Sequence, residues 1–243
     1  MAMRLRSLLI GLTGLFMAGA LAAQEAPTVA PLPPAPPTPP IEAENTWHLD
    51  LSTGGRVSIQ LRPDVAPNHV ERIKALTRRG FYNGLVFHRV IEGFMAQGGD
   101  PTGTGTGDSD LPNLTAEFSN LPHVRGALGM ARTQDPNSAN SQFYIMLVPR
   151  LSMDRNYTVL GRVVSGMNFV DALERGEPPL VPSRIVRASI GSDNVPSMSA
   201  AQIEAEAARL AAAAAPPPPS APPGTPVVLV PAPENAAQAD PPR

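Results

Sequence analysis

Cysteine is absent from this 243-residue chain, and its absence excludes several kinds of chemistry at once. Without thiols there is no disulfide framework, no cysteine nucleophile and no zinc site built on thiolates. A lipid anchor on an N-terminal cysteine is excluded for the same reason. The sequence also lacks the G-x-S-x-G and P-loop patterns that mark many hydrolases and nucleotide-binding proteins.

An excess of positive charge is also missing. The chain has 19 basic and 21 acidic residues, a formal net charge of −2 and a pI of about 6.1. Because proteins that bind nucleic acids usually carry a basic surface, we expect no nucleic-acid partner. The few histidines have no metal-ligand spacing with one another or with carboxylates, so we expect no metal site; they are His48, His69, His88 and His123.

Proline, in contrast, is abundant and unevenly placed. Of 30 prolines, eight lie in Pro27–Pro40 and eleven in Pro216–Pro242. Such stretches bury too little apolar surface to offset chain entropy, so we expect both flanks to be disordered and dispensable for catalysis. The alanine-rich segment Ala200–Ala215 could form a short exposed helix within the second flank. The predicted divisions are a signal peptide at 1–23, a proline-rich linker at 24–44, one domain at 45–195 and an Ala/Pro-rich disordered tail at 196–243.

The first residues have the order of an export signal. Arg4 and Arg6 precede the apolar run Leu8–Leu21, and small residues at 20–23 form an A-x-A-like cleavage site. The alternative is an uncleaved membrane anchor, but the run is shorter than the ~20 residues needed to span a bilayer. We therefore expect cleavage, no stable membrane insertion afterwards, and a periplasmic or secreted product.

The region between the flanks contains short β-rich segments bounded by turn residues. Two further segments, 64–76 and 167–174, have helical spacing of apolar residues. This pattern predicts a mainly β fold, a closed antiparallel eight-stranded β-barrel with two flanking helices. A closed barrel would leave no unpaired edge strand. The predicted strands are 47–51, 56–61, 85–91, 94–97, 126–131, 142–148, 157–164 and 184–190.

The stretch Phe87–Asp100 reads FHRVIEGFMAQGGD and is the most informative in the chain. Arg89 interrupts an otherwise apolar strand, Phe94 and Met95 supply bulky apolar groups, and Gln97 supplies an amide. From the pattern alone, Arg89 could equally lie on a solvated face without any chemical role.

Three further segments follow in a recognisable order: GMAR at Gly129–Arg132, NSQFYI at Asn140–Ile145 and NYTVLGRVV at Asn156–Val164. Together with Phe87–Asp100, they resemble the signature of cyclophilin-type peptidyl-prolyl cis–trans isomerases. The resemblance extends over residues 45–195.

The resemblance implies that Arg89 is the catalytic residue and that nine other residues bind substrate: Phe94, Met95, Gln97, Ala131, Arg132, Gln142, Tyr144, Met153 and Tyr157. The chain departs from the family pattern at four of these positions. Phenylalanine, leucine, asparagine and histidine are usual where this chain has, respectively, Tyr144, Met153, Arg132 and Tyr157.

The implied reaction is rotation about an X–Pro bond, which breaks no bond and needs no cofactor. The expected partners are proline-containing unfolded or exported polypeptides, whose folding a monomeric enzyme would assist. Two alternatives remain open at this point. The domain could be a peptide-binding or chaperone module without isomerase activity, or the proline-rich ends could be the functional parts of an envelope spacer.

Overall fold

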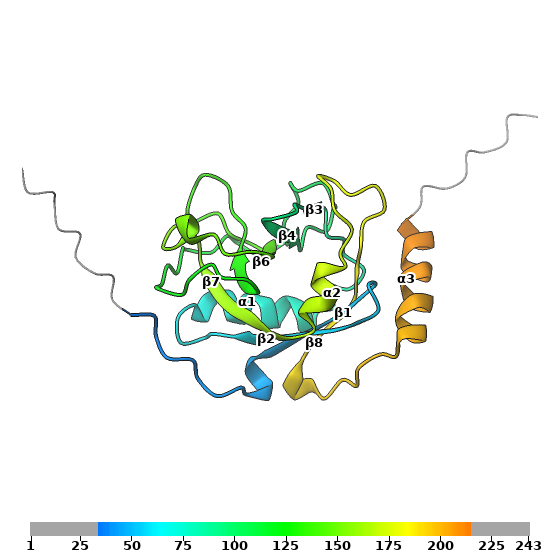
Figure 1. The fold of residues 1–243 in the computed structure, drawn as a ribbon, viewed down its shortest axis with the longest axis horizontal. Coiled ribbons are helices and arrows are strands. Elements are labelled where there is room, and N and C mark those ends of the chain that lie inside the picture. Colours follow the sequence, from blue (N-terminus) through cyan, green and yellow to red (C-terminus); the bar gives the residue numbers. More distant parts are fainter. Residues whose placement is uncertain (1–33, 215–243) are drawn as a thin grey trace, which may run out of the picture. The chain divides into compact units, whose positions relative to one another are not determined.

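The computed structural model describes residues 34–214, so the predicted signal peptide at 1–23 lies outside the described part. Eight antiparallel strands form one sheet in the order β3-β4-β6-β5-β7-β2-β1-β8 (Figure 1). The strands are β1 (Thr46–Leu51), β2 (Gly55–Leu61), β3 (Arg89–Val90), β4 (Met95–Gly98), β5 (Ala127–Met130), β6 (Phe143–Met146), β7 (Val159–Ser165) and β8 (Ile185–Ile190).

The prediction of a closed barrel is wrong, because the sheet is an open half-barrel with β3 and β8 at its ends. The strand predicted at 85–91 forms a ladder only at its last two residues, in β3. The residues of that segment before β3 contact the start of β8 and the residues just before it through separate backbone hydrogen bonds, such as Ile185 N to Leu85 O at 2.8 Å and Phe87 N to Ser183 O at 2.9 Å. These bonds pair some of the backbone N–H and C=O groups at this edge of the sheet, but they do not form a continuous ladder.

Three α-helices occur among residues 34–214: α1 (Pro67–Arg78), α2 (Met167–Asp171) and α3 (Ala200–Ala214). The first two correspond to the predicted helices, and α2 is shorter than expected. Pro67 starts α1, where its missing N–H costs no hydrogen bond. The helix then buries Val70, Ile73 and Leu76 at helical spacing against the sheet. No helix in the described residues is long and apolar enough to cross a bilayer.

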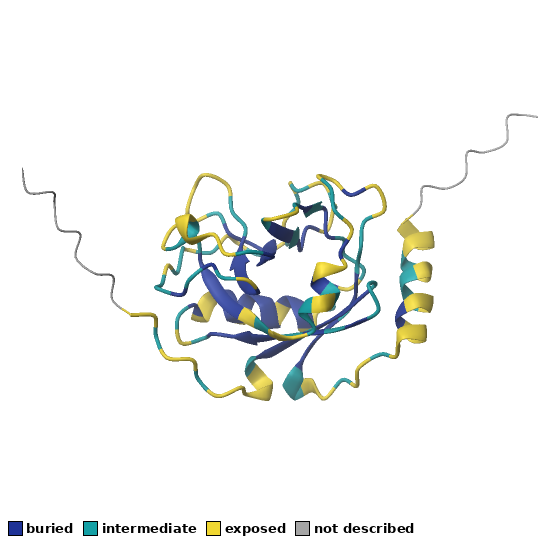
Figure 2. Cartoon of the chain, in the orientation of Figure 1, coloured by how far each residue is buried: buried dark blue, intermediate teal, exposed yellow. Residues whose placement is uncertain are grey.

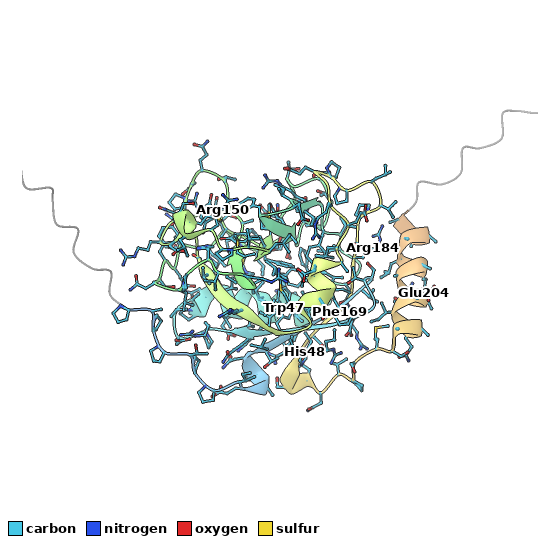
Figure 3. All side chains as sticks on the ribbon, viewed as in Figure 1. Trp47, His48, Arg150, Phe169, Arg184 and Glu204 are labelled. Atoms are coloured by element: carbon cyan, nitrogen blue, oxygen red, sulfur yellow. The ribbon has the colours of Figure 1, made fainter. Side chains whose placement is uncertain are left out.

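The main core lies between the sheet and α1, where the strands are dark blue in Figure 2. Its centre is aromatic: the ring of Trp47 meets those of Tyr82 and Phe143 edge-on, with centroids 5.2 and 5.0 Å apart. Trp47, labelled in Figure 3, is completely buried. These rings fix β1 and β6 relative to the loop after α1, and β6 in turn carries part of the candidate site.

A buried carboxylate ties the sheet to the segment that follows it. Asp50 is 1% exposed and accepts hydrogen bonds from Arg56 at 2.8 Å and from Arg187 at 2.9 Å. Both arginines also donate to the backbone oxygen of Pro196. The chain beyond β8 is therefore held to β1 and β2.

The short helix expected at 200–215 is present as α3, so the disorder predicted for the tail as a whole does not hold for residues 200–214. Its Ile203 is only 1% exposed, and its Leu210 packs beside the backbone of Gly84. Ile203 is the one buried residue of α3; residues 206, 207 and 210 are half-buried and the rest of the helix is exposed (Figure 2). The rest of the predicted tail, residues 215–243, lies outside the described part.

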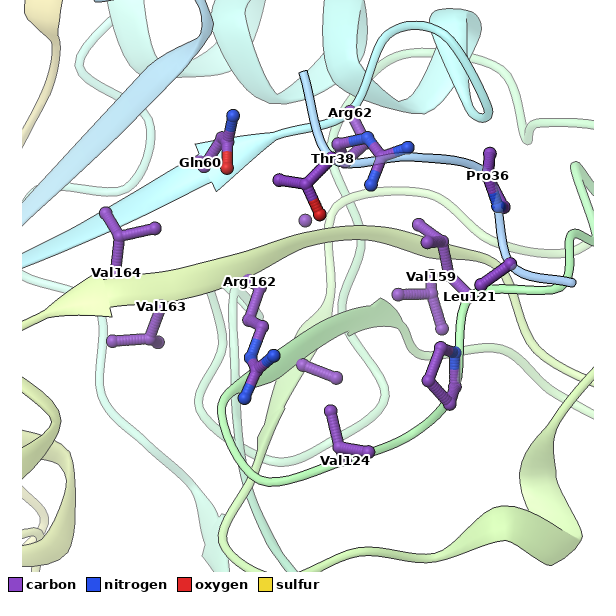
Figure 4. A pocket seen from close by; sticks show the side chains of 14 residues that line it. Pro36, Thr38, Gln60, Arg62, Leu121, Val124, Val159, Arg162, Val163 and Val164 are labelled. Atoms are coloured by element: carbon purple, nitrogen blue, oxygen red, sulfur yellow. The ribbon is translucent and has the colours of Figure 1, made fainter. Parts of the chain in front are cut away.

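The proline-rich linker is also partly docked, contrary to the prediction of disorder. Gln60 donates to the carbonyls of Pro39 and Pro40 at 2.8 and 3.2 Å, and Arg62 donates to that of Pro37 at 3.0 Å. Proline has no N–H but keeps its carbonyl acceptor, which explains how this segment can bind. Beneath it lies a pocket of about 490 Å³, shown in Figure 4.

Candidate active site

The strand pair β3–β4 places Arg89 directly opposite Gln97. Between the two strands, Gly93 has a φ of +67°, a left-handed conformation that glycine adopts without strain. This tight turn brings Phe94 and Met95 back beside Arg89. The Arg89 side chain is 41% exposed, and its Nε donates to Oε2 of Glu177 at 2.7 Å.

Nine of the ten predicted site residues line a single pocket of about 130 Å³. They are Arg89, Phe94, Met95, Gln97, Ala131, Arg132, Tyr144, Met153 and Tyr157. The tenth, Gln142, lies behind the pocket, where its Oε1 accepts a hydrogen bond from Gln97 at 2.9 Å. Its amide nitrogen donates to the backbone of Gly105 and Gly107. Gln142 thus links Gln97 to the glycine-rich loop.

The apolar part of the pocket rests on a second hydrophobic cluster, separate from the main core. Successive residues of a strand point to opposite faces of the sheet. In β4, Met95 belongs to this second cluster and Ala96 to the main core; in β6, Tyr144 and Phe143 divide in the same way. Both faces of the sheet are therefore buried here, which explains why β6 reads as the continuous apolar run FYIM.

Two residues that the sequence analysis did not single out hold Tyr144 in place. Its hydroxyl lies 2.9 Å from Nε2 of His123, whose Nδ1 lies 2.8 Å from Asp154. Burial lowers the pKa of His123, although Asp154 partly opposes that shift, and burial raises the pKa of Tyr144. With a neutral ring, Nδ1–H donates to Asp154 and Nε2 accepts from the tyrosine hydroxyl. The sequence offered one sign of this contact: a tyrosine within an apolar strand buries a hydroxyl, and a buried hydroxyl needs a hydrogen-bond partner.

Two arginines cover aromatic rings at the rim of the pocket. Arg132 lies 4.3 Å from the ring centroid of Tyr157 and donates to Asn156 O at 2.8 Å. Arg150, labelled in Figure 3, lies 5.1 Å from the ring centroid of Phe94. Cation–π contacts of this kind restrict both partners. No motif around Arg150 in the sequence marks it as close to Phe94, so this contact could not be predicted.

A second pocket of about 440 Å³ continues from the first and shares Arg89, Gln97 and Arg132 with it. Its other walls are His88, residues 103–105 of the glycine-rich loop, and Glu177 and Pro178. Glu177 lies far from Arg89 in sequence, so no local motif indicated this contact. The two pockets together form one groove, with the Arg89 guanidinium where they meet.

Within residues 34–214, no group of His, Asp or Glu side chains is arranged to hold a metal ion. The groove therefore offers a charged donor, amides and apolar walls.

Comparison with known proteins gives a consistent result. A family model described as cyclophilin type peptidyl-prolyl cis-trans isomerase/CLD matches residues 48–190. A probable peptidyl-prolyl cis-trans isomerase of Brucella suis is 49% identical over an alignment that covers 63% of this chain and 85% of the relative. A crystal structure of the Hirschia baltica cyclophilin AquaCyp293 is similar, with 32% identity and a TM-score of 0.59 over 64% of this chain and 77% of that one. A Cryptosporidium parvum cyclophilin type isomerase, crystallised in the presence of the dipeptide Ala-Pro, has 26% identity and a TM-score of 0.56 over 60% of this chain and 98% of that one.

Proposed function

This chain belongs to the cyclophilin-type peptidyl-prolyl cis–trans isomerase family, and we propose that it acts on exported polypeptides with Arg89 as its catalytic residue. The enzyme class is that of its relatives, whose reaction is rotation about the peptide bond before proline. The observation that carries the proposal for the site is the single pocket in which Arg89 faces the apolar side chains of Phe94, Met95 and Met153.

The reaction needs a donor that acts in the twisted state. Rotation about an X–Pro bond has a barrier of ~18–20 kcal/mol, because it removes amide resonance. As the bond twists, the proline nitrogen regains a lone pair and becomes a hydrogen-bond acceptor. A donor directed at that nitrogen therefore binds the transition state better than the planar substrate.

The position of Arg89 lets it act as this donor. Its Nε is engaged by Glu177, which fixes one edge of the guanidinium. Its two terminal nitrogens have no hydrogen-bond partner among residues 34–214, so they remain available to the substrate. A guanidinium stays charged at any physiological pH, and its planar fork loses little freedom when it binds.

One hydrogen bond does not account for the whole rate. An acceleration of 10⁴–10⁵ requires about 5–7 kcal/mol, whereas a charged hydrogen bond contributes about 1.5–3 kcal/mol. The remainder comes from the apolar pocket, which holds the proline ring and excludes water from Arg89. It also comes from binding of the flanking peptide by Gln97, Ala131 and Arg132, which line the same pocket. The Ala-Pro dipeptide used with the Cryptosporidium parvum relative supports a proline-sized occupant.

We also propose that the enzyme works as a monomer outside the cytoplasm. The one chain brings together nine of the ten residues that the family resemblance assigns to the site, which supports a site that functions within a monomer. The basic, apolar and small-residue order of the first 23 positions supports export. N-terminal sequencing of the protein recovered from its producing cells tests this: a mature chain starting near residue 23 or 24 supports export, and one starting at Met1 contradicts it.

The isomerase proposal is tested with the purified chain and a short X-Pro peptide whose trans form a protease cleaves. The cis-to-trans rate should rise in proportion to the concentration of the chain. A peptide-binding module without activity would bind the peptide but leave this rate unchanged, which would refute the proposal.

A further inference from the structure

The loop between α2 and β8 has an unusual tip. Leu180 and Val181 are 94% and 75% exposed, more than any other large apolar residues in the described part of the chain. Single exposed apolar side chains are common on protein surfaces. Two adjacent ones at the tip of an ordered loop beside a binding groove are better explained by contact with another chain.

This loop is held in place at its base rather than free. Gly176 exchanges two backbone hydrogen bonds with Val90 of β3, at 2.8 and 2.9 Å, and Ser183 O accepts from Phe87 N at 2.9 Å. Between these anchors the sequence is Glu-Pro-Pro-Leu-Val-Pro, and its three prolines have restricted φ angles. In Figure 1 the loop is the yellow segment that rises beside β3. A restrained loop loses little entropy when its tip binds a partner.

The tip is continuous with the catalytic groove. Glu177 and Pro178 line the 440 Å³ pocket together with Arg89. Leu180 is only two residues further on, so its Cα lies within about 7 Å of that of Pro178. The loop therefore extends the polar wall of the groove into an apolar surface.

We propose that Leu180 and Val181 form a docking surface for apolar residues that flank the target proline in an unfolded client polypeptide. This inference rests on the proposed function, because the client is positioned by its proline in the pocket beside Arg89. An extended chain advances about 3.3 Å per residue, so residues a few positions from the proline reach the loop. Folded proteins bury most of their large apolar residues, and the surface thus selects chains that have not yet folded.

The test compares wild type with the double variant Leu180→Ser/Val181→Ser. The matched control is Ile41→Ser, which removes another exposed apolar side chain, 61% exposed, from the proline-rich linker. In Figure 1 the blue linker and the yellow loop lie at opposite edges of the domain. Each protein is assayed on a short X-Pro peptide and on a protein whose refolding is limited by prolyl isomerisation. Binding to a permanently unfolded, reduced and alkylated protein is measured in parallel.

The double variant should keep wild-type kcat/KM on the short peptide within about twofold. On the refolding protein its efficiency should fall about tenfold, as expected when contact with two apolar side chains is lost. Binding to the unfolded protein should weaken by a similar factor, and Ile41→Ser should change neither value. Equal efficiency of wild type and double variant on the refolding protein would overturn the docking surface.

Three other outcomes would distinguish a failure of the docking surface from a failure of the proposed isomerase function. If the double variant also lost activity on the short peptide, the loop would act through β3, and the docking proposal would be wrong. If wild type lacked isomerase activity, the proposed function would be wrong. The docking surface would still be tested by comparing how tightly wild type and the double variant bind the unfolded protein. Self-association of wild type that the double variant abolished would identify a second copy as the occupant, and would overturn the choice of a client.

Discussion

Removal of one hydroxyl from the pocket wall, in Tyr144→Phe, tests the hydrogen-bonded chain behind the site. Tyr144 is 4% exposed, and its hydroxyl lies 2.9 Å from Nε2 of the fully buried His123. The substitution leaves Nε2 as a buried acceptor with no partner. That loss should lower the free energy of unfolding by about 2 kcal/mol, which lowers Tm by about 4–8 °C in a domain of this size.

Activity should respond differently from stability. The aromatic ring remains after the substitution and still forms the wall of the pocket, so kcat/KM on a short X-Pro peptide should stay within about threefold of wild type. The matched control is Tyr157→Phe, because the hydroxyl of Tyr157 makes no hydrogen bond within residues 34–214. That control should leave Tm within about 1–2 °C of wild type, because it leaves no buried group without its hydrogen-bond partner.

Urea and thermal unfolding, followed by circular dichroism, measure both variants. A Tyr144→Phe protein as stable as wild type would show that the bond to His123 contributes nothing, and would refute the reasoning. An equal loss of stability in Tyr157→Phe would refute it as well, because the effect would then not depend on the buried partner.

Three further predictions concern stability. Burial lowers the pKa of all four histidines below that of a free imidazole, so the unfolded chain binds more protons than the folded one below about pH 7. The free energy of unfolding should therefore fall from about pH 7 to about pH 5; urea titrations that give the same stability at both pH values would contradict this. Asp50→Ala leaves Arg56 and Arg187 without their shared carboxylate and should cost about 3 kcal/mol, whereas Tm within a degree of wild type would argue against the network. Gln60→Ala removes the bonds to the docked linker and should cost about 1 kcal/mol with unchanged kcat/KM; a loss of activity would show that the linker reaches the site.

The sequence predicted the strands and helices well where a repeating pattern marks them. Segments 47–51 and 56–61 appear as β1 and β2, and the spacing of Val70, Ile73 and Leu76 appears on the buried face of α1. Barrel closure could not be predicted in this way. Closure depends on how many residues at each edge find a partner, and β3 has only two.

The docking of the linker and of helix α3 onto the domain could not be predicted either, for a different reason. Composition shows that a proline-rich or alanine-rich segment has few apolar side chains, but it does not show where its backbone can bind. The carbonyls of Pro37, Pro39 and Pro40 are bound by Arg62 and Gln60, polar residues that strand periodicity cannot identify as buried partners.

At the site, the pattern alone left Arg89 as either catalytic or merely solvated, and its exposure of 41% agrees with both. The resemblance to a family supplied the pocket residues, which the structure brings together. The supporting contacts of Glu177, His123 and Arg150 could not be predicted, because each joins segments distant in the chain.

The measurement that tests the central claim most directly is kcat/KM of Arg89→Ala on a short X-Pro peptide. The control is Arg175→Ala, which removes another partly exposed arginine, one bonded to Glu92. Arg89→Ala should lose at least about a hundredfold in kcat/KM, the effect of losing about 3 kcal/mol in the transition state. Arg89→Lys should also be poor, since lysine lacks the planar fork. Circular dichroism and Tm should match wild type, because the Arg89 side chain lines an open groove. Near-wild-type activity of a folded Arg89→Ala protein would contradict the account.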